Sequence, residues 1–175
     1  MFLQPSKTLA VFDLREGMRV ADFGAGSGAY AHDASIRVGH TGKVYAIEVQ
    51  KELLKKLEAD IKESHITNIE CIWGDIEKKG GVKLADGSMD RVIIANVLFQ
   101  ATDKLGLIDE AKRILKKDGM VLLVDWKDSY GGLGPAPEHV VLQTAATQLF
   151  VKRGFTVGEI ISVSEHHYGI IFRHE

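Results

Sequence analysis

The sequence contains little cysteine, little proline and almost no excess charge, and each shortage excludes a class of protein. Cys71 is the single cysteine among 175 residues, which excludes an intrachain disulfide and a multi-cysteine zinc site. With only three prolines, linker composition does not account for the 18 glycines. The formal charge is −2, so no overall basic field is present that would attract nucleic acid or an anionic membrane surface.

Long apolar runs are missing as well. No run approaches the roughly 18 residues that a membrane-spanning helix needs, and residues 1–17 lack the basic and apolar segments of a signal peptide. We therefore expect a cytoplasmic protein with no transmembrane segment, either a monomer or a small homo-oligomer. The length predicts one domain over 1–175, with 1–14 as an N-terminal lid or docking segment.

Short apolar runs rich in Val and Ile alternate with amphipathic segments along the chain. The runs suit β-strands, and several are apolar on both faces, as in a sheet that is covered on both sides. They span residues 18–23, 43–48, 68–73, 91–95, 120–125, 155–163 and 168–173. The segments between them predict helices with the stripes Leu53/Leu57/Ile61, Leu107/Ala111/Ile114 and, from Pro137, Val141/Ala145/Leu149.

The lengths of the links predict the topology of the sheet. Strand–helix alternation with short links is typical of a doubly wound, mostly parallel α/β sheet with helices on both faces. Residues 164–167 form too short a link for a parallel crossover, so the last two strands should form an antiparallel hairpin. Asp118-Gly119 should end one helix and start the fifth strand, and 127–137 should be a loop at that strand's carboxyl end.

The segment VADFGAGSGAYA at 20–31 carries the strongest functional signal. It runs from a predicted strand through Gly24, Gly26 and Gly28 into a predicted helix. Glycines let the backbone turn sharply and approach a ligand closely, and the helix N-terminus offers free N–H groups. The spacing also satisfies a dinucleotide fingerprint, so a nicotinamide-dependent oxidoreductase is an alternative, as is a tight turn with no ligand.

Three acids at the ends of successive predicted strands narrow the choice of ligand. Asp22 precedes the glycines, Glu48 ends the second strand and Asp75 follows Gly74 after the third. A carboxylate at position 22 would repel a pyrophosphate but attract an ammonium group. Glu48 is placed to bind ribose hydroxyls, and Asp75 could accept from an adenine amino group. S-adenosylmethionine fits these features better than NAD.

With these features the chain resembles the class I S-adenosylmethionine-dependent methyltransferases, and within them the small enzymes near the ubiquinone/menaquinone-biosynthesis C-methyltransferases. The likeness is carried by 20–31, VYAIEV at 44–49, ECIWGDIE at 70–77, DRVIIANVLFQ at 90–100 and GMVLLVDWK at 119–127. It implies a Rossmann-like seven-stranded sheet with an antiparallel last strand. It also implies methyl transfer from S-adenosylmethionine, with S-adenosylhomocysteine as product, to a small-molecule acceptor. A cofactor-binding protein without activity is the other alternative.

The resemblance further implies roles for individual residues. The expected cofactor-binding residues are Asp22, Gly24, Ala25, Gly26, Gly28, Glu48, Val49, Gly74, Asp75, Ile76 and Asn96. Asn96 is expected near the transferred methyl group, at the end of the fourth strand. The structural alternatives are solvated strand ends for Asp22 and Glu48, a helix N-cap for Asp75 and a turn residue for Asn96.

Catalysis of methyl transfer requires alignment of the acceptor and exclusion of water, and a base only where the acceptor must lose a proton. The turn before the last strand carries His166 and His167, which could supply such a base or simply form an exposed turn. Contacts to the acceptor are expected from Phe2, Gln100, Trp126, Lys127 and Tyr130. No His, Asp or Glu cluster has metal-ligand spacing, so no metal site is expected.

Overall fold

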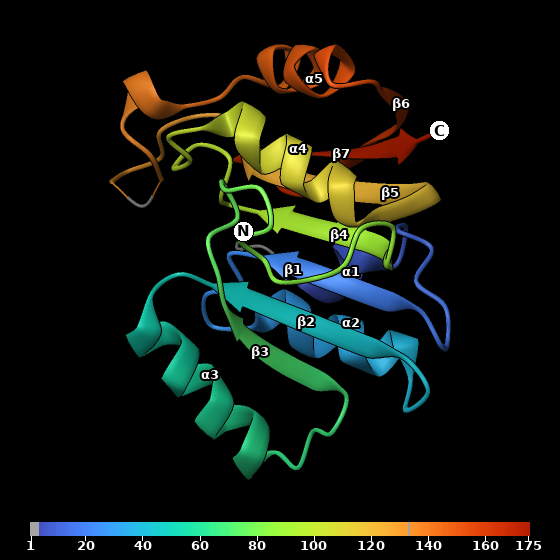
Figure 1. Ribbon diagram of the computed structural model, residues 1–175. Coiled ribbons are helices and arrows are strands. Elements are labelled where there is room, and N and C mark those ends of the chain that lie inside the picture. Colours follow the sequence, from blue (N-terminus) through green and yellow to red (C-terminus); the bar gives the residue numbers. More distant parts are fainter. Residues whose placement is uncertain (1–3, 133) are drawn as a thin grey trace.

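The computed structural model describes residues 4–132 and 134–175, so Phe2 lies outside the described part of the chain. Seven strands form one sheet of order β3-β2-β1-β4-β5-β7-β6 (Figure 1). In chain order the elements are α1 (Pro5–Leu9), β1 (Arg19–Phe23), α2 (Ala29–Val38), β2 (Lys43–Glu48), α3 (Lys51–Glu63), β3 (Ile69–Trp73), β4 (Met89–Ala95), α4 (Lys104–Ile114), β5 (Leu115–Trp126), the 3-10 helix η1 (Pro137–His139), α5 (Gln143–Lys152), β6 (Phe155–Ser162) and β7 (His167–His174).

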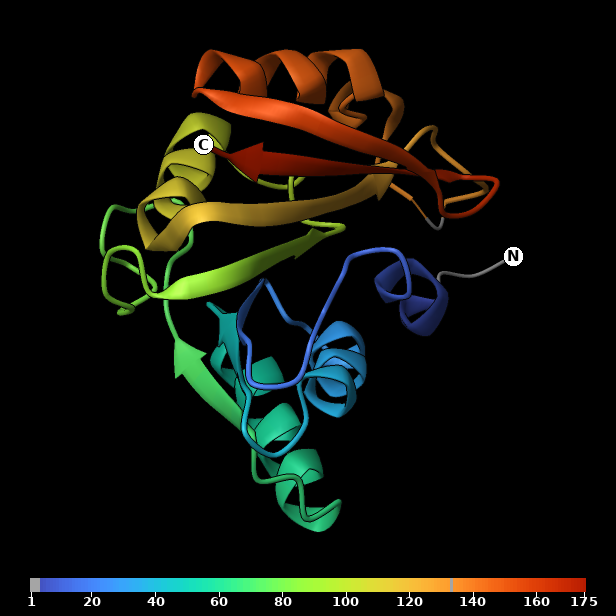
Figure 2. The ribbon, with the colours of Figure 1, turned by 90° about the vertical axis from the view of Figure 1, so that its right-hand side faces the viewer.

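The topology predicted from link lengths is confirmed. β7 is antiparallel to both β5 and β6, and the other pairs are parallel. Strand order reverses between β1 and β4, which is the kind of point where open α/β sheets hold their ligands. Figure 2 shows the carboxyl ends of β4 and β5, helix α1 and the β6–β7 turn on the same side of the molecule.

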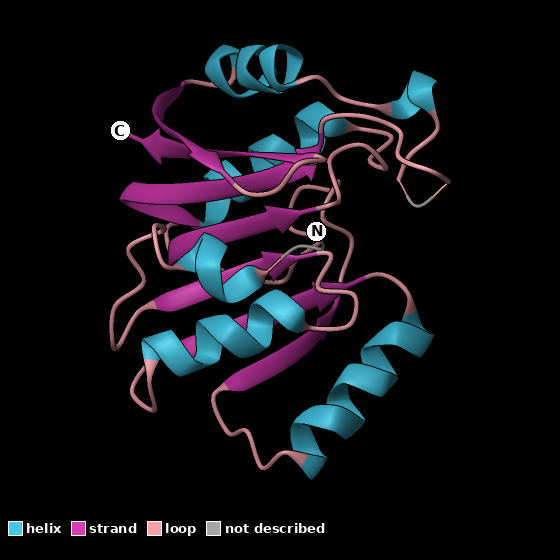
Figure 3. Ribbon diagram, turned by 180° about the vertical axis from the view of Figure 1, so that it is seen from behind, coloured by secondary structure: helices cyan, strands magenta, loops and turns pink. Residues whose placement is uncertain are grey.

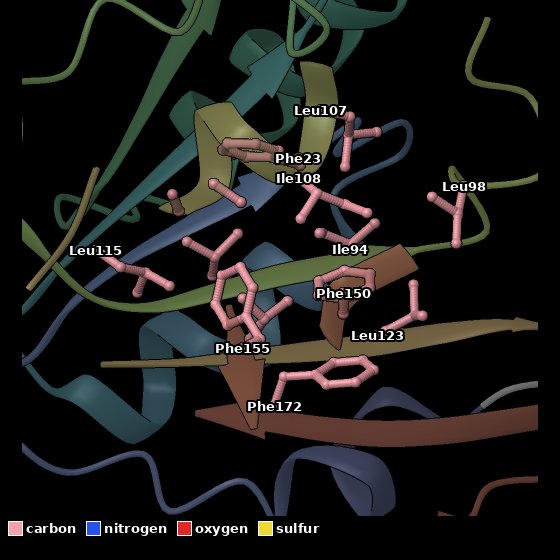
Figure 4. Close-up of a cluster of buried hydrophobic side chains, with 14 of the residues drawn as sticks. Phe23, Ile94, Leu98, Leu107, Ile108, Leu115, Leu123, Phe150, Phe155 and Phe172 are labelled. Atoms are coloured by element: carbon pink, nitrogen blue, oxygen red, sulfur yellow. The ribbon is translucent and has the colours of Figure 1, made fainter. Parts of the chain in front are cut away.

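Helices cover both faces of the sheet, as the strands' apolar composition requires (Figure 3). Helices α1, α2 and α3 pack in one buried cluster, to which they contribute Leu9, Tyr30, Ala31, Ala34, Val38, Leu57 and Ile61. Helices α4 and α5 pack on the other face with Leu107, Ile108, Ala111, Ile114, Ala146 and Phe150. Figure 4 shows this second core, where the rings of Phe150 and Phe172 stack with their centroids 4.1 Å apart.

The helix predicted from Pro137 begins later and buries a different face. After η1 the backbone is extended through Leu142, and α5 starts at Gln143. Its buried residues are Ala146 and Phe150, whereas Ala145 is exposed. The Tyr168 hydroxyl donates a hydrogen bond to the Val141 carbonyl at 3.0 Å, a tertiary contact that periodicity does not reveal.

The fifth strand is longer than predicted. β5 begins at Leu115 directly after α4, so the turn predicted at Asp118-Gly119 lies within a strand. Asp118 has a φ of 64°, and the pairing of β4 with β5 shifts register between Met89 and Arg91. Turn-forming residues here produce an irregularity in the ladder instead of ending it.

The N-terminal segment docks on the face that carries α2. Leu9 and Phe12 are buried, and the Arg91 guanidinium lies 5.9 Å from the Phe12 ring centroid and 3.5 Å from the Asp13 carboxylate. These contacts favour the docking role, and the lid role stays a prediction. Within residues 4–132 and 134–175, no helix has the length and apolar character to cross a membrane.

Candidate active site

A cavity of about 890 Å³ lies at the carboxyl ends of β1, β2, β3 and β4, and all its described lining residues fall between Pro5 and Asp103. Its volume is within the roughly 300–1,000 Å³ of small-molecule and cofactor sites. The predicted cofactor residues that line it are Asp22, Gly24, Ala25, Gly26, Glu48, Val49, Gly74, Asp75, Ile76 and Asn96. The topology therefore brings the acids and the glycine loop together, and their binding role stays a prediction.

The glycine loop is tied to the neighbouring strand and leaves open space above it. The N–H groups of Gly24 and Ala25 donate to the Ile47 carbonyl at 2.9 and 3.0 Å. At Gly26, with a φ of 55°, an added Cβ would find its nearest neighbour, the Gly24 carbonyl oxygen, 3.9 Å away. This opening is where a ligand can approach the backbone.

Gly28 has a different role from the other two glycines. It does not line the cavity, and an added Cβ would collide with the Leu57 side chain of α3. With a φ of 81° it is the N-cap residue of α2. Gly28 therefore permits the close packing of α2 and α3 beneath the loop.

Glu48 is a buried acid with both oxygens held by backbone donors. Glu48 is the last residue of β2 and is 5% exposed. Its Oε2 accepts a hydrogen bond from Gly26 N at 3.1 Å. Oε1 accepts from Gln50 N at 2.8 Å. Because each carboxylate oxygen has two lone pairs, Glu48 keeps the capacity to accept from ligand hydroxyls.

Asp22 is a buried carboxyl group with an unused oxygen. The residue is 2% exposed, and its Oδ2 has no hydrogen-bond partner among the described residues. Burial raises its pKa to about 7, and the charge of Glu48 adds to the rise, although the Ala31 N–H opposes it. A cationic group of a ligand would complete this site, since it would favour the ionised carboxylate.

Asp75 follows β3, two strands along the sheet from Asp22, and lies in a turn. Its Oδ1 accepts from Glu77 N at 3.0 Å, and its Oδ2 lies 3.1 Å from Lys78 Nζ. These interactions hold the pKa of Asp75 below its usual value, the Glu77 N–H having the largest effect. The side chain thus supports the turn and also lines the cavity, but the N-cap alternative is wrong, because no helix lies between β3 and β4 in the described residues 74–88.

The residue that holds this turn in place comes from α4 and was not predicted from the sequence. Glu110 of α4 is 1% exposed and accepts from Gly80 N at 2.9 Å and Val82 N at 3.2 Å. Arg113 donates to both of its oxygens at 2.8 Å. The available signal was its spacing from Leu107 and Ile114, which puts an acid on the core face of the helix.

Asn96 follows β4 with a left-handed backbone, at a φ of 57°. Its N–H donates to the Val124 carbonyl at 2.8 Å, and its carbonyl accepts from Gln100 Nε2 at 2.7 Å. Its side-chain Oδ1 is buried without a partner among the described residues. Asn96 and Gln100 both line the cavity, so a residue with a left-handed backbone and an unsatisfied side-chain oxygen lies beside the ligand space.

The structure does not bring His167 to the cavity, and its predicted place in the turn is wrong. His167 is the first residue of β7, is buried, and has its ring 4.1 Å from that of Trp126. The Ser164 hydroxyl lies 2.9 Å from its Nδ1. Burial lowers its pKa to about 4, with a further contribution from His166.

His166, Lys127 and Tyr130 pack the 127–137 loop against the β6–β7 turn and likewise do not line the cavity. The His166 ring stacks on Tyr130 at 3.8 Å, and its Nδ1 lies 3.0 Å from Asp128 Oδ1. Lys127 Nζ donates to the Ser164 carbonyl at 3.0 Å. These residues form a separate contact at the same rim.

Comparison with known proteins places this architecture in a family. Residues 14–161 match a family model described as a methyltransferase domain. The chain belongs to this methyltransferase family. A crystal structure described as a SAM-dependent methyltransferase from Aquifex aeolicus superposes on the methyltransferase domain with a TM-score of 0.90 and 30% identity, covering 98% of this chain and 89% of that one.

Two curated relatives of the methyltransferase domain carry names that specify acceptors. A demethylmenaquinone methyltransferase of Lactococcus lactis is 29% identical over 69% of this chain and 46% of the relative. An arsenite methyltransferase of Halobacterium salinarum is 29% identical over 82% of this chain and 35% of the relative. The chain spans about half the length of the curated relatives it matches, or less.

The family and the Aquifex aeolicus structure indicate S-adenosylmethionine as the cofactor, and the cavity fits it. Asp22, whose Oδ2 lacks a partner among the described residues, suits an ammonium group. Glu48 suits hydroxyls, and the open glycine loop leaves room for the part of the ligand between them. Lys78 is the one Lys or Arg among the described lining residues, and it pairs with Asp75. The carboxylate of Asp22 in the same cavity would repel a pyrophosphate, which counts against the nicotinamide alternative.

Proposed function

We propose that this methyltransferase domain transfers the methyl group of S-adenosylmethionine to a small organic acceptor by in-line displacement. The observation that carries the proposal is the buried Asp22 carboxyl group, whose Oδ2 has no partner among the described residues and which lines one cavity with Glu48 and the glycine loop. Asp22 would hold the ammonium group, Glu48 the ribose hydroxyls, and Asp75 with the Ile76 backbone the adenine. When bound, the sulfonium supplies an activated methyl group and a neutral leaving group.

The charges of the cavity favour an acceptor that is uncharged or positively charged. Its described lining contains five acids and one lysine; the acids are Asp22, Glu48, Asp75, Glu77 and Asp103. An anionic acceptor would be repelled by this surplus of negative charge. The Asn96 Oδ1 supports an acceptor that carries an O–H or N–H group next to the atom that is methylated.

The acceptors named for the relatives fit this site unequally. A reduced quinone is uncharged and has O–H groups that could donate to Asn96. Arsenite is a soft ion for which thiolates are the natural ligands. The chain's one thiol, Cys71, lies within β3, and burial, with Glu58 and Glu70 nearby, raises its pKa to about 11. We therefore favour the organic acceptor over arsenite.

We propose that the residues of the cavity contribute to catalysis by aligning the acceptor with the cofactor. His166 and His167 lie outside the cavity lining, and a histidine with a pKa of about 4 is a poor proton acceptor at neutral pH. We therefore propose a displacement that does not need a histidine base. Activity of H166A and H167A within a few-fold of wild type would support this proposal, and a loss above about 100-fold would restore the predicted base.

Calorimetry and methyl transfer test the proposed function together. The chain should bind S-adenosylmethionine and S-adenosylhomocysteine but not NADH. Labelled methyl should move from the cofactor to uncharged or cationic acceptors in a panel that also contains anionic compounds and arsenite. N96A should lower transfer more than cofactor affinity. Tighter binding of NADH would favour the oxidoreductase, and binding without transfer to any acceptor would favour a non-catalytic protein.

A further inference from the structure

Asp125, the next-to-last residue of β5, is a buried acid that does not line the cavity and has no role so far. It is 0% exposed, and both of its oxygens accept backbone hydrogen bonds. Oδ2 accepts from Phe99 N, in the turn after β4, at 3.0 Å, and Oδ1 accepts from Trp126 N at 2.8 Å. A buried carboxyl group is costly, so its place between β5 and this turn points to a role in the turn.

The turn that Asp125 holds carries Asn96 and Gln100, two polar residues that line the cavity. The Asn96 N–H donates to the Val124 carbonyl at 2.8 Å, and the Asn96 carbonyl accepts from Gln100 Nε2 at 2.7 Å. Val124 is the chain neighbour of Asp125, and Gln100 is the chain neighbour of Phe99. The hydrogen bond from Phe99 to Asp125 therefore lies between the two contacts that fix the Asn96 backbone.

The far end of the turn is fixed by α4. Lys104 Nζ donates to the Ala101 carbonyl at 2.7 Å, and the Ala101 N–H donates to the Val97 carbonyl at 3.1 Å. Between them, Leu98 is fully buried in the core. The turn is thus anchored by an acid on an N–H group and by a lysine on a carbonyl.

We propose that Asp125 is a positioning residue for methyl transfer, which fixes Asn96 against the acceptor through the turn after β4. The Asn96 Oδ1, buried without a partner among the described residues, then meets the acceptor's O–H or N–H group in one orientation. Misplacement of such a group by about 1 Å costs on the order of 100-fold in rate. This inference rests on the proposed function, because it assumes that Asn96 contacts the acceptor.

The charge of Asp125 makes this contact sensitive to pH. Burial raises its pKa to about 6, although nearby N–H groups, that of Trp126 above all, and the charge of Lys104 oppose the rise. On β7, Tyr168 is paired with Asp125, and burial with this carboxylate raises the Tyr168 pKa, whereas burial lowers the pKa of His167 to about 4. Protonation of Asp125 below pH 6 converts an acceptor oxygen into a donor, which costs the turn a contact.

Kinetics at saturating S-adenosylmethionine test the proposal, with the uncharged or cationic acceptor that turns over fastest. D125N should lower kcat at least about tenfold at pH 7.5 and keep affinity for S-adenosylhomocysteine within about threefold of wild type. Wild-type kcat should fall as the pH drops through 6, and D125N should lack that fall. Saturating cofactor keeps Asp22 ionised, so its titration does not enter kcat. An unchanged kcat in D125N, or the same fall in both proteins, would overturn the proposal.

A double-mutant cycle separates positioning from a general loss of structure. If Asp125 acts through Asn96, the kcat of D125N/N96A should equal that of N96A within about twofold. Losses that multiply would mean that Asp125 acts elsewhere, which overturns the proposal.

NMR tests the same link without an acceptor. In the S-adenosylhomocysteine complex, the Phe99 N–H and Asn96 side-chain amide signals should shift together with a midpoint near pH 6, and neither should do so in D125N. An Asn96 signal that does not follow that of Phe99 would overturn the proposal.

Asp90 provides a matched control at the other end of β4. Its Oδ2 accepts from Arg19 N at 2.8 Å, its Oδ1 lies 2.7 Å from Lys116 Nζ, and it does not line the cavity. D90N should lower the Tm but keep the wild-type kcat and its pH profile. A loss of kcat in D90N equal to that in D125N would mean that kcat follows general stability, which overturns the proposal.

The two levels of the proposal fail differently. If wild type transfers methyl to no acceptor, the proposed function itself is wrong. If wild type is active and D125N matches it, only the role of Asp125 is wrong.

Discussion

The carboxylate of Glu48, at the end of β2, accepts the backbone N–H of Gly26 from the loop after β1 at 3.1 Å. Its other oxygen accepts from Gln50 N at 2.8 Å. One buried acid thus holds two walls of the cavity in place before a ligand arrives. Such preorganisation lowers the entropic cost of binding.

Removal of the Glu48 side chain should weaken both the ligand site and the loop. E48A should lower affinity for S-adenosylhomocysteine by about tenfold or more, because ligand hydroxyls lose a charged acceptor. Its Tm should fall, since the Gly26 and Gln50 N–H groups lose their partner. E48Q keeps one acceptor oxygen and should lie between E48A and wild type. E52A, at an exposed position of α3, is the control, and calorimetry in which E48A matches it would contradict this role.

Asp22 should make cofactor affinity depend on pH. Burial raises its pKa to about 7 in the free protein, whereas an ammonium ligand requires the ionised carboxylate. Binding below pH 7 must therefore release a proton, and affinity for S-adenosylhomocysteine should rise with pH by up to about tenfold per unit until the rise levels off above pH 7. D22N should bind weakly at every pH. Calorimetry from pH 5.5 to 8 that shows equal slopes for both proteins would rule out Asp22 as the titrating group.

The same carboxylate should reduce the stability of the free protein at high pH. Its pKa rises on folding from 3.8 to about 7, so its contribution to stability is largest below pH 4 and is lost as the pH rises through 7. D22N should therefore raise the Tm more at pH 8 than at pH 5. Asp125, whose pKa is also raised, is present in both proteins and cancels in the difference. A D22N protein that melts below wild type at pH 8 would contradict a destabilising buried charge at Asp22.

Gly26 and Gly28 should respond differently to the same substitution. Both have a positive φ, but an added methyl group meets Leu57 only at Gly28. G28A should lower the free energy of unfolding by about 2 kcal/mol, and L57A in that background should recover part of the loss. G26A should cost about 1 kcal/mol and weaken cofactor binding more than G28A does. Denaturant titration and calorimetry on both variants separate these effects, and identical profiles would contradict them.

Glu110 should be a major source of stability for the turn at residues 75–82. E110A leaves Arg113 and two backbone N–H groups without their acceptor, which predicts a loss of about 3 kcal/mol. The pKa of Glu110 is below its usual value, so its contribution is present above pH 4.5 and disappears as the pH falls through the lowered pKa. D109A removes a more exposed pair with Arg153 and should cost less than about 1 kcal/mol. Equal losses in urea titrations at pH 7 would refute this difference.

Elements defined by local patterns were predictable from the sequence. The stripe Leu107/Ala111/Ile114 is buried in α4, and the short link at 164–167 correctly indicates the antiparallel hairpin. The start of α5 was not predictable, because the contact from Tyr168 to Val141 joins residues 27 positions apart. Asp118-Gly119 is a turn-forming pair, but the pairing of β4 with β5 keeps these residues within a strand.

The site was predictable where strand order alone gathers its residues. Asp22, Glu48 and Asp75 each follow or end a parallel strand, so their shared rim follows from topology. Glu110 has a weaker signal, its spacing from Leu107 and Ile114, because its importance depends on burial of a polar group. The position of His167 was missed because β7 begins at that residue and buries it against Trp126.

Every described residue that lines the cavity precedes β5 in the chain. The N-terminal and C-terminal parts of the chain therefore have different functions. On the proposed function, residues 5–103 supply the cofactor site and, through Asn96, a contact to the acceptor, so most changes there would be selected against. The 127–137 loop and the β6–β7 turn lie at the same rim but contribute no described residue to that lining. Mutations there can accumulate and be tested by selection without loss of cofactor affinity. On this proposal, descendants of this chain can acquire new acceptors through divergence in the C-terminal loops while the cofactor site is kept.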